Sequence, residues 1–267
     1  MTHKLFDTHA HYFDARFAAE TVGADALLPA LFAGDVGGIV NVGTDLATSK
    51  AVVAQAARYP AMYAAVGIHP TDGMRYADPD AAVADLAALI GTPEDRRAKK
   101  IVAFGEIGLD YHYDDTDRVR QAALFEMQLA LAETLGIPVI IHDREAHGDC
   151  FEAILRHPAV FGVFHSYSGS AELARELTRR GWYISFSGVV TYKNADRVRE
   201  AVRAVPEERL LIETDCPYLS PVPHRGEINH SGYLCYTAAA VAAARGVTAD
   251  RIAEATAENA CRLFGIA

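Results

Sequence analysis

The chain has 267 residues, of which 51% are apolar, so it can bury a large core as one large domain or as two small ones. Its 25 basic and 35 acidic residues give a formal net charge of −10. This charge excludes long-range attraction to a polyanion, so any contact with nucleic acid must be local or mediated by metal.

The N-terminal segment and the cysteines indicate the cellular setting. The opening MTHKLFDTHAHYFD has no apolar leader core, and the most apolar stretches fall short of the roughly 18 residues that span a membrane. The four cysteines form neither a CxxC pair nor an evenly spaced framework. We therefore expect a soluble, cytoplasmic protein with reduced thiols and no membrane partner.

Short apolar runs alternate along the whole chain with Ala-, Leu- and Arg-rich segments of helical character. The predicted strands are residues 4–11, 38–44, 62–69, 100–109, 138–143, 161–168, 182–189 and 210–215. The predicted helices include residues 47–59, 79–90, 117–136, 170–181 and 195–205. Eight βα units in about 250 residues predict an α/β fold, a (β/α)8 TIM barrel, as a single domain over residues 1–267. An open doubly wound sheet is the alternative, and it lacks a GxGxxG turn after the first strand.

Several predicted strands end in residues that can bind metal. Because the carboxyl ends of barrel strands meet on one face, residues far apart in sequence would share a pocket there. A single histidine in an apolar strand is more often a hydrogen-bonded core residue, but repetition at the same end of different strands favours metal binding. These residues are His9, His11, His69, Glu106, His142, His165 and Asp215.

The number of ligands indicates more than one ion. Even four of these histidines together with the two carboxylates exceed the three protein ligands that a catalytic zinc ion usually takes. Two ions close together need a bridging carboxylate, and Glu106 is the candidate. A metal ion would also explain a charge inside the apolar run VAFGEIGLD, where it is otherwise costly.

Other catalytic motifs and nucleophiles have weaker support in the sequence. The chain has no GxSxG elbow and no GxxxxGK[ST] loop. Cys216 beside Asp215 would be a nucleophile if a histidine activated it, but a small apolar side chain at the barrel rim is the favoured interpretation.

Several segments together resemble the TatD family of metal-dependent deoxyribonucleases, within the amidohydrolase-like superfamily. The resemblance spans essentially the whole chain. It rests on FDTHAHYFD, NVGTDLATSKAVVAQAARYP, YAAVGIHP, VAFGEIGLDYHYD, PVIIHDREAH, FHSYSGS, YISFSGVVTYKNADRVREAVRAVP, LLIETDCPYLSPVPHRG and TAENACRLFG.

The resemblance implies a divalent-metal hydrolase that cuts phosphodiester bonds of DNA, with activity of the 3′ to 5′ exonuclease type. It implies that one ion is held by His9, His11, Glu106 and Asp215, and the second by Glu106, His142 and His165. Asp215 would take the proton of the attacking water, with Glu106 as the other catalytic carboxylate. The implied substrate contacts are His69, Arg225 and Asn229. Arg144, Tyr111 and His112 are further candidates because we expect them in loops next to the predicted ligands. Mg²⁺, Mn²⁺ and Zn²⁺ are the candidate ions, and we expect a monomer without an obligate protein partner.

The sequence departs from the family pattern at one basic segment. Where RGKRNEP is usual, this chain has RGEINHS, with Glu227 and Ile228 in place of two basic residues. This loss of positive charge favours an alternative to a nuclease, namely an amide, ester, lactone or aminoacyl-RNA hydrolase at the same site. A further alternative is a metal-dependent binding protein without turnover, against which stands the complete set of candidate ligands together with Asp215.

Overall fold

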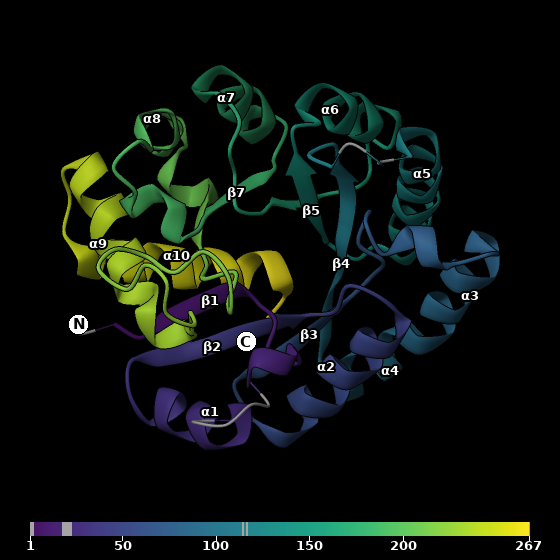
Figure 1. Ribbon diagram of the computed structural model, residues 1–267, viewed down its shortest axis with the longest axis horizontal. Helices are drawn as coiled ribbons and strands as arrows, with labels where there is room; N and C mark the ends of the chain where they lie inside the picture. The colour runs from purple at the N-terminus through teal and green to yellow at the C-terminus, as the bar shows by residue number, and fades with distance from the viewer. Residues whose placement is uncertain (1–2, 18–22, 114, 116, 267) are drawn as a thin grey trace. The chain divides into compact units, whose positions relative to one another are not determined.

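The computed structural model describes residues 3–17, 23–113, 115 and 117–266, so the ends of the predicted domain, 1–2 and 267, lie outside the described residues. The chain forms two compact units. The first consists of Met1–Asn41 and His165–Ala267, and the second of Val42–Phe164. Figure 1 labels the elements of both.

The first unit contains a parallel sheet with the strand order β7, β8, β1, β2. Tyr183–Phe186 (β7) pairs with Leu210–Ile212 (β8), and Leu5–Ala10 (β1) pairs with Val36–Val42 (β2), whose last residue begins the second unit. A parallel bridge between Ala10 and Cys216 joins β1 to the segment after β8. The α-helices of this unit are α1 (Ala24–Ala33), α7 (Ala171–Arg179), α8 (Asp196–Ala204), α9 (Leu234–Arg245) and α10 (Ala249–Phe264). Its 3-10 helices are η1 (Ala15–Phe17), η3 (Gly188–Thr191), η4 (Glu207–Arg209) and η5 (Ser231–Tyr233).

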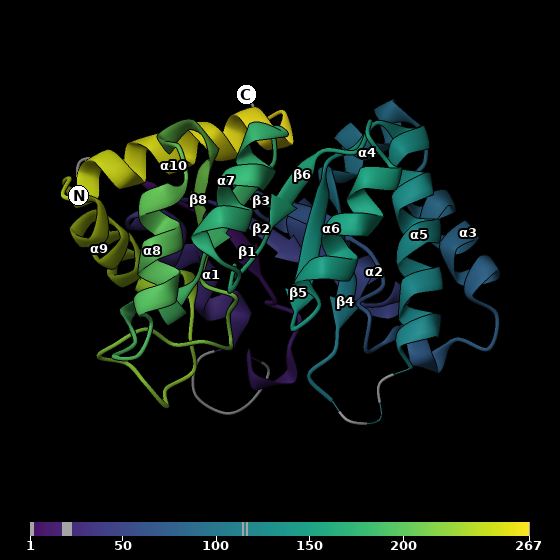
Figure 2. The same cartoon turned by 90° about the horizontal axis from the view of Figure 1, so that it is seen from above.

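The second unit contains the other four strands, in the order in which they occur along the chain. They are β3 (Met62–Val66), β4 (Ile101–Asp110), β5 (Val139–Arg144) and β6 (Gly162–Phe164), all paired in parallel. Its helices are α2 (Leu46–Arg58), the 3-10 helix η2 (Gly73–Arg75), α3 (Pro79–Ile90), α4 (Pro93–Lys99), α5 (Arg118–Leu135) and α6 (His147–Arg156). Helix α5 packs along β4, as both ribbon views show (Figures 1 and 2).

The strand order confirms the predicted fold class. Strands β1 to β8 follow the order of the chain, and helices alternate with them, which is the (β/α)8 barrel pattern. A doubly wound sheet would instead reverse its strand order at a switch point.

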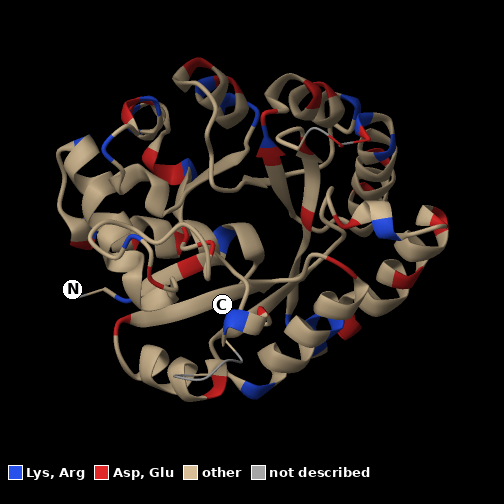
Figure 3. Ribbon diagram, viewed as in Figure 1, with Lys and Arg blue, Asp and Glu red and all other residues tan. Residues whose placement is uncertain are grey.

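The strands are largely apolar and buried, as expected for parallel strands that are covered on both faces. All six residues of β1 are buried. In Figure 3 the strands are mostly tan, while the charged residues lie chiefly on helices and loops. Within the strands the charged residues are Asp7, Glu106, Asp110, Asp143 and Arg144. The strands therefore carry four buried or half-buried carboxylates and one arginine, which is exposed. Another source of positive charge is needed to balance these carboxylates.

Several strands end earlier than the sequence predicts. The run predicted over 161–168 is a strand only to Phe164, and that over 210–215 only to Ile212. In both places the chain soon takes a left-handed backbone conformation, at Ser166 (φ 40°) and Asp215 (φ 56°). The residues expected at the strand ends there belong to short loops that begin at those ends.

The predicted helices of the second unit agree closely with the helices in the structure. Helix α3 covers the predicted 79–90, and α2 and α5 agree with the predicted helices to within a residue at each end. Helix α4 was not predicted, because its seven residues PEDRRAK are all at least partly exposed and show no apolar face. No helix among the described residues is both long and apolar enough to cross a membrane.

Candidate metal centre

Three ligand atoms from two segments of the first unit converge at the end of β1. His9 Nε2 lies 3.0 Å from His11 Nε2, and Asp215 Oδ1 lies 3.3 Å from His11 Nε2 and 3.7 Å from His9 Nε2. Atoms bound to one ion at about 2.0–2.2 Å are separated by roughly 3 to 3.5 Å, so these three fit one cation. The ring of His165 stacks on that of His9, with 4.0 Å between centroids, and belongs to the same candidate cluster.

Backbone pairing between β1 and the segment after β8 brings these ligands together. The Asp215 amide donates to the His9 carbonyl across 2.9 Å, and the His11 amide donates to the Cys216 carbonyl across 2.7 Å. His9 and His11 are two residues apart, so both side chains leave the extended chain on the same side. The positive φ of Asp215 is uncommon for a residue other than glycine, and such conformations concentrate at functional sites.

Asp7 is a buried carboxylate that the sequence analysis did not single out. It accepts hydrogen bonds from the Thr214 amide and hydroxyl at 2.9 and 2.6 Å and from the Ser231 hydroxyl at 2.7 Å. Burial raises the pKa of Asp7 to about 6, although its hydrogen bonds from Thr214 and Ser231 act in the opposite direction. Asp7 therefore holds the segment that carries Asp215 against the strand that carries His9.

Glu213 orients His165. Its Oε1 accepts from the Ser166 amide at 2.7 Å and lies 3.2 Å from His165 Nδ1. Because that oxygen already accepts a backbone hydrogen bond, we assign the ring proton to Nδ1, which leaves the lone pair of Nε2 for a metal ion. The other oxygen, Oε2, is buried without a hydrogen-bond partner in the described part of the chain. The charge of this fully buried residue therefore favours a cation nearby.

The electrostatics of the first cluster favour an ionised Asp215. Burial raises the pKa of Asp215, but the hydrogen bond from His11 and the charges on His9, His165 and His11 outweigh it, so the pKa lies below its ordinary value. A divalent cation would replace these imidazolium charges, since ligating histidines must be neutral. The donor set of histidine nitrogens and carboxylate oxygens suits Zn²⁺ and Mn²⁺.

A second cluster lies within the second unit, around His142 on β5. Its Nδ1 is 2.6 Å from Glu106 Oε1, and its Nε2 is 3.1 Å from Asp110 Oδ2. The pairing of β4 with β5 places Gly108 opposite His142, so the two carboxylates flank the ring from the neighbouring strand. Burial raises the pKa of Asp110, but the hydrogen bonds from His142 and the His112 amide and the charge of His142 bring it below its usual value. Both nitrogens of His142 thus face groups that attract a cation.

His69 belongs to this cluster, but its geometry suits a hydrogen-bond donor better than a ligand. The Thr71 amide donates to His69 Nδ1 across 3.2 Å, and the Thr71 hydroxyl lies 2.7 Å from the same nitrogen. An accepting Nδ1 leaves the proton of the neutral ring on Nε2, which lies 3.6 Å from Glu106 Oε1. His69, Asp110 and His142 are close enough to hold one ion, yet Nε2 with its proton would not ligate it. This assignment agrees with a substrate contact.

Two glutamines of α5 fix the loops after β3 and β4. Gln128 accepts from the Ile68 amide at 2.9 Å and donates to the Ile68 carbonyl at 3.0 Å. Gln121 accepts from the Asp110 amide at 2.9 Å. Both side chains are buried. They therefore set the backbone beside His69 and at Asp110, and nothing in the helical pattern distinguishes them from polar surface positions.

The predicted substrate residues have different surroundings. Arg144 is exposed, with its guanidinium 5.6 Å from the ring centre of Tyr113. Arg225 is exposed and stacks on Tyr192 at 3.9 Å. Asn229 is fully buried, and its Nδ2 donates to the Thr214 and Tyr218 carbonyls at 2.9 and 2.7 Å. Its amide stabilises the loop around Asp215, and its contact with substrate stays a prediction.

The segment with the lost basic residues forms a local network of its own. Glu227 accepts from the Tyr233 hydroxyl at 2.7 Å and lies 3.0 Å from His224 Nδ1. The ring of His224 stacks on Tyr233 with 3.9 Å between centroids. Glu227 therefore has a structural role in this loop, while Ile228 is exposed.

Three further candidates from the sequence have other roles. Cys216 is fully buried, and burial raises the pKa of its thiol well above the usual value, so it is not an activated nucleophile. Tyr111 donates to Asp149 across 2.6 Å, and His112 Nδ1 lies 2.7 Å from Glu145.

Within each unit the structure brings predicted ligands close together. In the first unit these are His9, His11, His165 and Asp215, and in the second they are Glu106 and His142, with His69 and Asp110 beside them. Asp7, Asp110 and Glu213 were missed, although each is an acidic residue in an apolar run, the signal that identified Glu106.

Comparison with known proteins gives a consistent picture. The sequence model of the family described as TatD related DNase matches residues 6–265. The "uncharacterized metal-dependent hydrolase YabD" of Bacillus subtilis is 39% identical over 265 residues, covering 98% of this chain and 99% of the relative. The "uncharacterized metal-dependent hydrolase TatD" of Mycobacterium tuberculosis is 34% identical, covering 98% of both chains.

Solved structures agree with the fold. The crystal structure of the TatD homologue YjjV from Escherichia coli aligns over 100% of both chains, with a TM-score of 0.87 and 32% identity. A TatD-family hydrolase from Entamoeba histolytica aligns over 99% of both, with a TM-score of 0.85, and its 19% identity supports the fold alone. The chain is a metal-dependent hydrolase with the (β/α)8 fold, and it belongs to the TatD-related DNase family.

Proposed function

We propose that this hydrolase cleaves phosphodiester bonds of DNA from the 3′ end, using two divalent ions and a water molecule. The observation that carries the proposal is the convergence of His9 Nε2, His11 Nε2 and Asp215 Oδ1 within 3.0–3.7 Å. We assign the two ions, Mg²⁺, Mn²⁺ or Zn²⁺, to the six residues named from the resemblance, His9, His11, Glu106, His142, His165 and Asp215. A shared role of Glu106 for both ions rests on the resemblance.

In this proposal the residues around the ions transfer protons or keep them on a particular atom. Bound divalent cations lower the pKa of water and offset negative charge on phosphoryl oxygens. Asp215, with its lowered pKa, is ionised at neutral pH and accepts the proton of the attacking water. His69 offers its Nε2 proton to a phosphoryl oxygen or to the leaving oxygen. Glu213 keeps His165 in the required tautomer throughout.

A nucleic acid substrate is supported by the family and by two exposed arginines. The matching family is described as TatD related DNase. Arg144 and Arg225 are exposed and lie over the rings of Tyr113 and Tyr192, at 5.6 and 3.9 Å, which leaves guanidinium edges for phosphate. Such local contacts suit a protein whose net charge of −10 gives no long-range attraction to DNA.

An amide or ester hydrolase, including one that removes an aminoacyl group from RNA, is the second candidate. The exposed Glu227 favours it, because this carboxylate stands where the family carries a basic residue and would repel a phosphate backbone. Small substrates need no electrostatic attraction of that kind.

The proposal includes the setting of the enzyme. We propose that the two units act as one catalytic domain, since the family match runs through both without a gap. The four cysteines are free thiols, which supports a reducing, cytoplasmic environment. We propose a monomer that needs no obligate protein partner.

The experiment is digestion of 3′-labelled single-stranded DNA by metal-stripped protein to which Mg²⁺, Mn²⁺ or Zn²⁺ is restored. The variants Asp215→Asn and Glu106→Ala exclude a contaminating nuclease, and the exposed Glu208→Gln serves as the matched control. Metal-dependent release of mononucleotides by the wild type and Glu208→Gln alone supports the proposal. Cleavage of amides or esters without any cleavage of DNA or RNA would replace it with the second candidate.

A further inference from the structure

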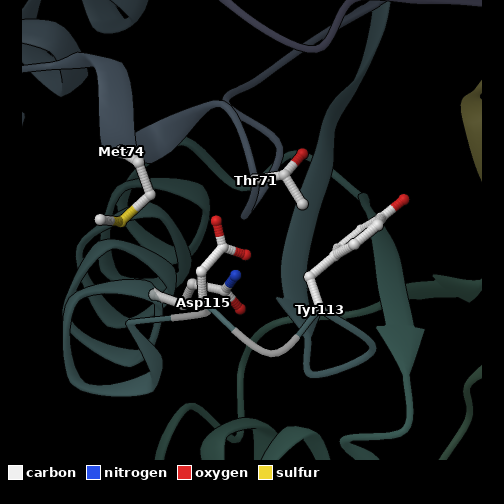
Figure 4. Close-up of a pocket in the computed structure, with 5 residues that line it drawn as sticks. Thr71, Met74, Tyr113 and Asp115 are labelled. Atoms are coloured by element: carbon white, nitrogen blue, oxygen red, sulfur yellow. The ribbon is translucent and has the colours of Figure 1, made fainter.

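A pocket of about 370 Å³ opens beside the second cluster and is not used by the chemistry described above. It is lined by Thr71, Met74, Tyr113, Asp115 and Gln121, all of the second unit. Its size lies at the lower end of the roughly 300–1,000 Å³ of small-molecule sites. In the view of Figure 4 the Asp115 carboxylate lies between Met74 and Tyr113.

The pocket is directly connected to residues of the second cluster. Thr71 bonds His69 Nδ1 through its hydroxyl at 2.7 Å, and Gln121 accepts from the Asp110 amide at 2.9 Å. A group bound in the pocket therefore lies one side chain away from both His69 and Asp110.

The wall that carries Thr71 and Met74 is firmly held. A side chain at Gly73 would come within 2.3 Å of Leu124 Cδ2, so η2 packs tightly against α5. The guanidinium of Arg120 donates to the Tyr76 carbonyl just beyond η2. This wall of the pocket is therefore preformed, as binding sites for small groups usually are.

The lining suits a flat, uncharged, aromatic group. Tyr113 is 51% exposed and Met74 41% exposed, so their apolar surfaces are open to a ligand. The Asp115 carboxylate accepts hydrogen bonds and would repel a phosphate, whereas Gln121 retains its Nε2 as a donor, since its Oε1 is engaged by Asp110. Arg144, 5.6 Å from the Tyr113 ring, places a positive charge beside the pocket for an attached phosphate.

We propose that this pocket binds one nucleobase of the substrate, stacked on Tyr113. This inference rests on the proposed function and adds to it a preference of the enzyme for certain bases. Adenine and cytosine carry an amino group next to a ring nitrogen, so they match the acceptor of Asp115 and the donor of Gln121. Thymine presents an oxygen where the amino group would be and is disfavoured.

The test compares binding of dAMP, dTMP and 2-deoxyribose 5-phosphate to the metal-loaded protein by calorimetry. Stacking of a base on an aromatic ring changes affinity by roughly 5- to 150-fold. We expect dAMP to bind about tenfold more tightly than the sugar phosphate, and Tyr113→Ala to remove this difference. Tyr113→Phe keeps the ring and should retain it. Phe161→Ala removes another exposed aromatic side chain of the same unit and should leave it unchanged. Asp115→Asn should reduce the preference for dAMP over dTMP.

The outcomes separate this inference from the proposed function. Cleavage of DNA together with equal affinities of wild type and Tyr113→Ala for dAMP would overturn the pocket assignment and leave the nuclease proposal intact. Tyr113-dependent binding of dAMP without cleavage of any phosphodiester would support the pocket and overturn the nuclease. Tight binding of an apolar ester in the pocket, with no preference for dAMP over the sugar phosphate, would overturn the nucleobase assignment.

Discussion

The buried carboxylate of Glu213 accepts a hydrogen bond from Nδ1 of His165 across 3.2 Å. Removing its charge should make Nε2 of His165 a poorer ligand while the shape of the side chain is kept. We expect Glu213→Gln to weaken metal binding by about 10- to 100-fold, as measured by isothermal titration calorimetry. The exposed Glu208→Gln is the control. Equal affinities for both variants would show that Glu213 does not tune His165.

The two clusters predict a definite metal stoichiometry. We expect two divalent ions per wild-type chain by native mass spectrometry, and one ion in either Asp215→Asn or His142→Ala, because the proposal assigns Asp215 to one ion and His142 to the other. Saturating metal at about 100 times Kd should stabilise the wild type by roughly 2.7 kcal/mol for each bound ion. Loss of both ions from either single variant would contradict the assignment of Asp215 and His142 to different ions.

The buried Asp7 predicts a pH dependence of stability. Its pKa is raised from 3.8 to about 6 in the folded state, so its stabilising contribution is present below the unfolded pKa and is lost as the pH rises through about 6. Relative to Asp7→Asn, metal-stripped wild type should gain roughly 1 kcal/mol in free energy of unfolding between about pH 7.5 and about pH 5. Urea denaturation of both proteins at each pH measures this difference. If the free energies of unfolding of wild type and Asp7→Asn changed equally with pH, the raised pKa of Asp7 would be contradicted.

Gln128 should matter for both stability and activity. Replacing it with Met leaves the buried amide and carbonyl of Ile68 without partners, at a cost of about 1–3 kcal/mol for each group. We expect a loss of roughly 2–5 kcal/mol in urea denaturation and reduced turnover, because the neighbouring His69 loses its support. Thr134→Ala, at an exposed position of the same helix, should change stability little. A stable Gln128→Met variant with normal turnover would refute this role.

The fold class and most candidate ligands could be predicted from sequence because both leave a regular pattern. The alternation of strands and helices is visible as a change in the spacing of apolar residues along the sequence. His9, His11 and His142 lie at the ends of apolar runs. Glu106 is recognisable as a charge inside such a run. The same signal applies to Asp7, Asp110 and Glu213, and only the contacts of the folded chain show their roles.

What the sequence did not predict depends on tertiary contacts. The early ends of β6 and β8 follow from left-handed conformations at Ser166 and Asp215, which local propensity disfavours. The buried amide of Asn229 looks like any polar loop residue until its bonds to the Thr214 and Tyr218 carbonyls are seen. This structural role of Asn229 could not be predicted from the sequence alone.

The two glutamines of α5 limit how this protein can be recombined with its relatives. Gln121 and Gln128 are seven residues apart, close to two helical turns, so both face the strands. A single inserted residue between them would rotate one by about 100° and detach a loop that carries a cluster residue. A chimera that exchanges α5 alone must therefore keep this spacing, whereas a block from β3 through α5 carries its own matched pair of contacts. The unit of exchange in this half of the barrel is thus larger than one helix.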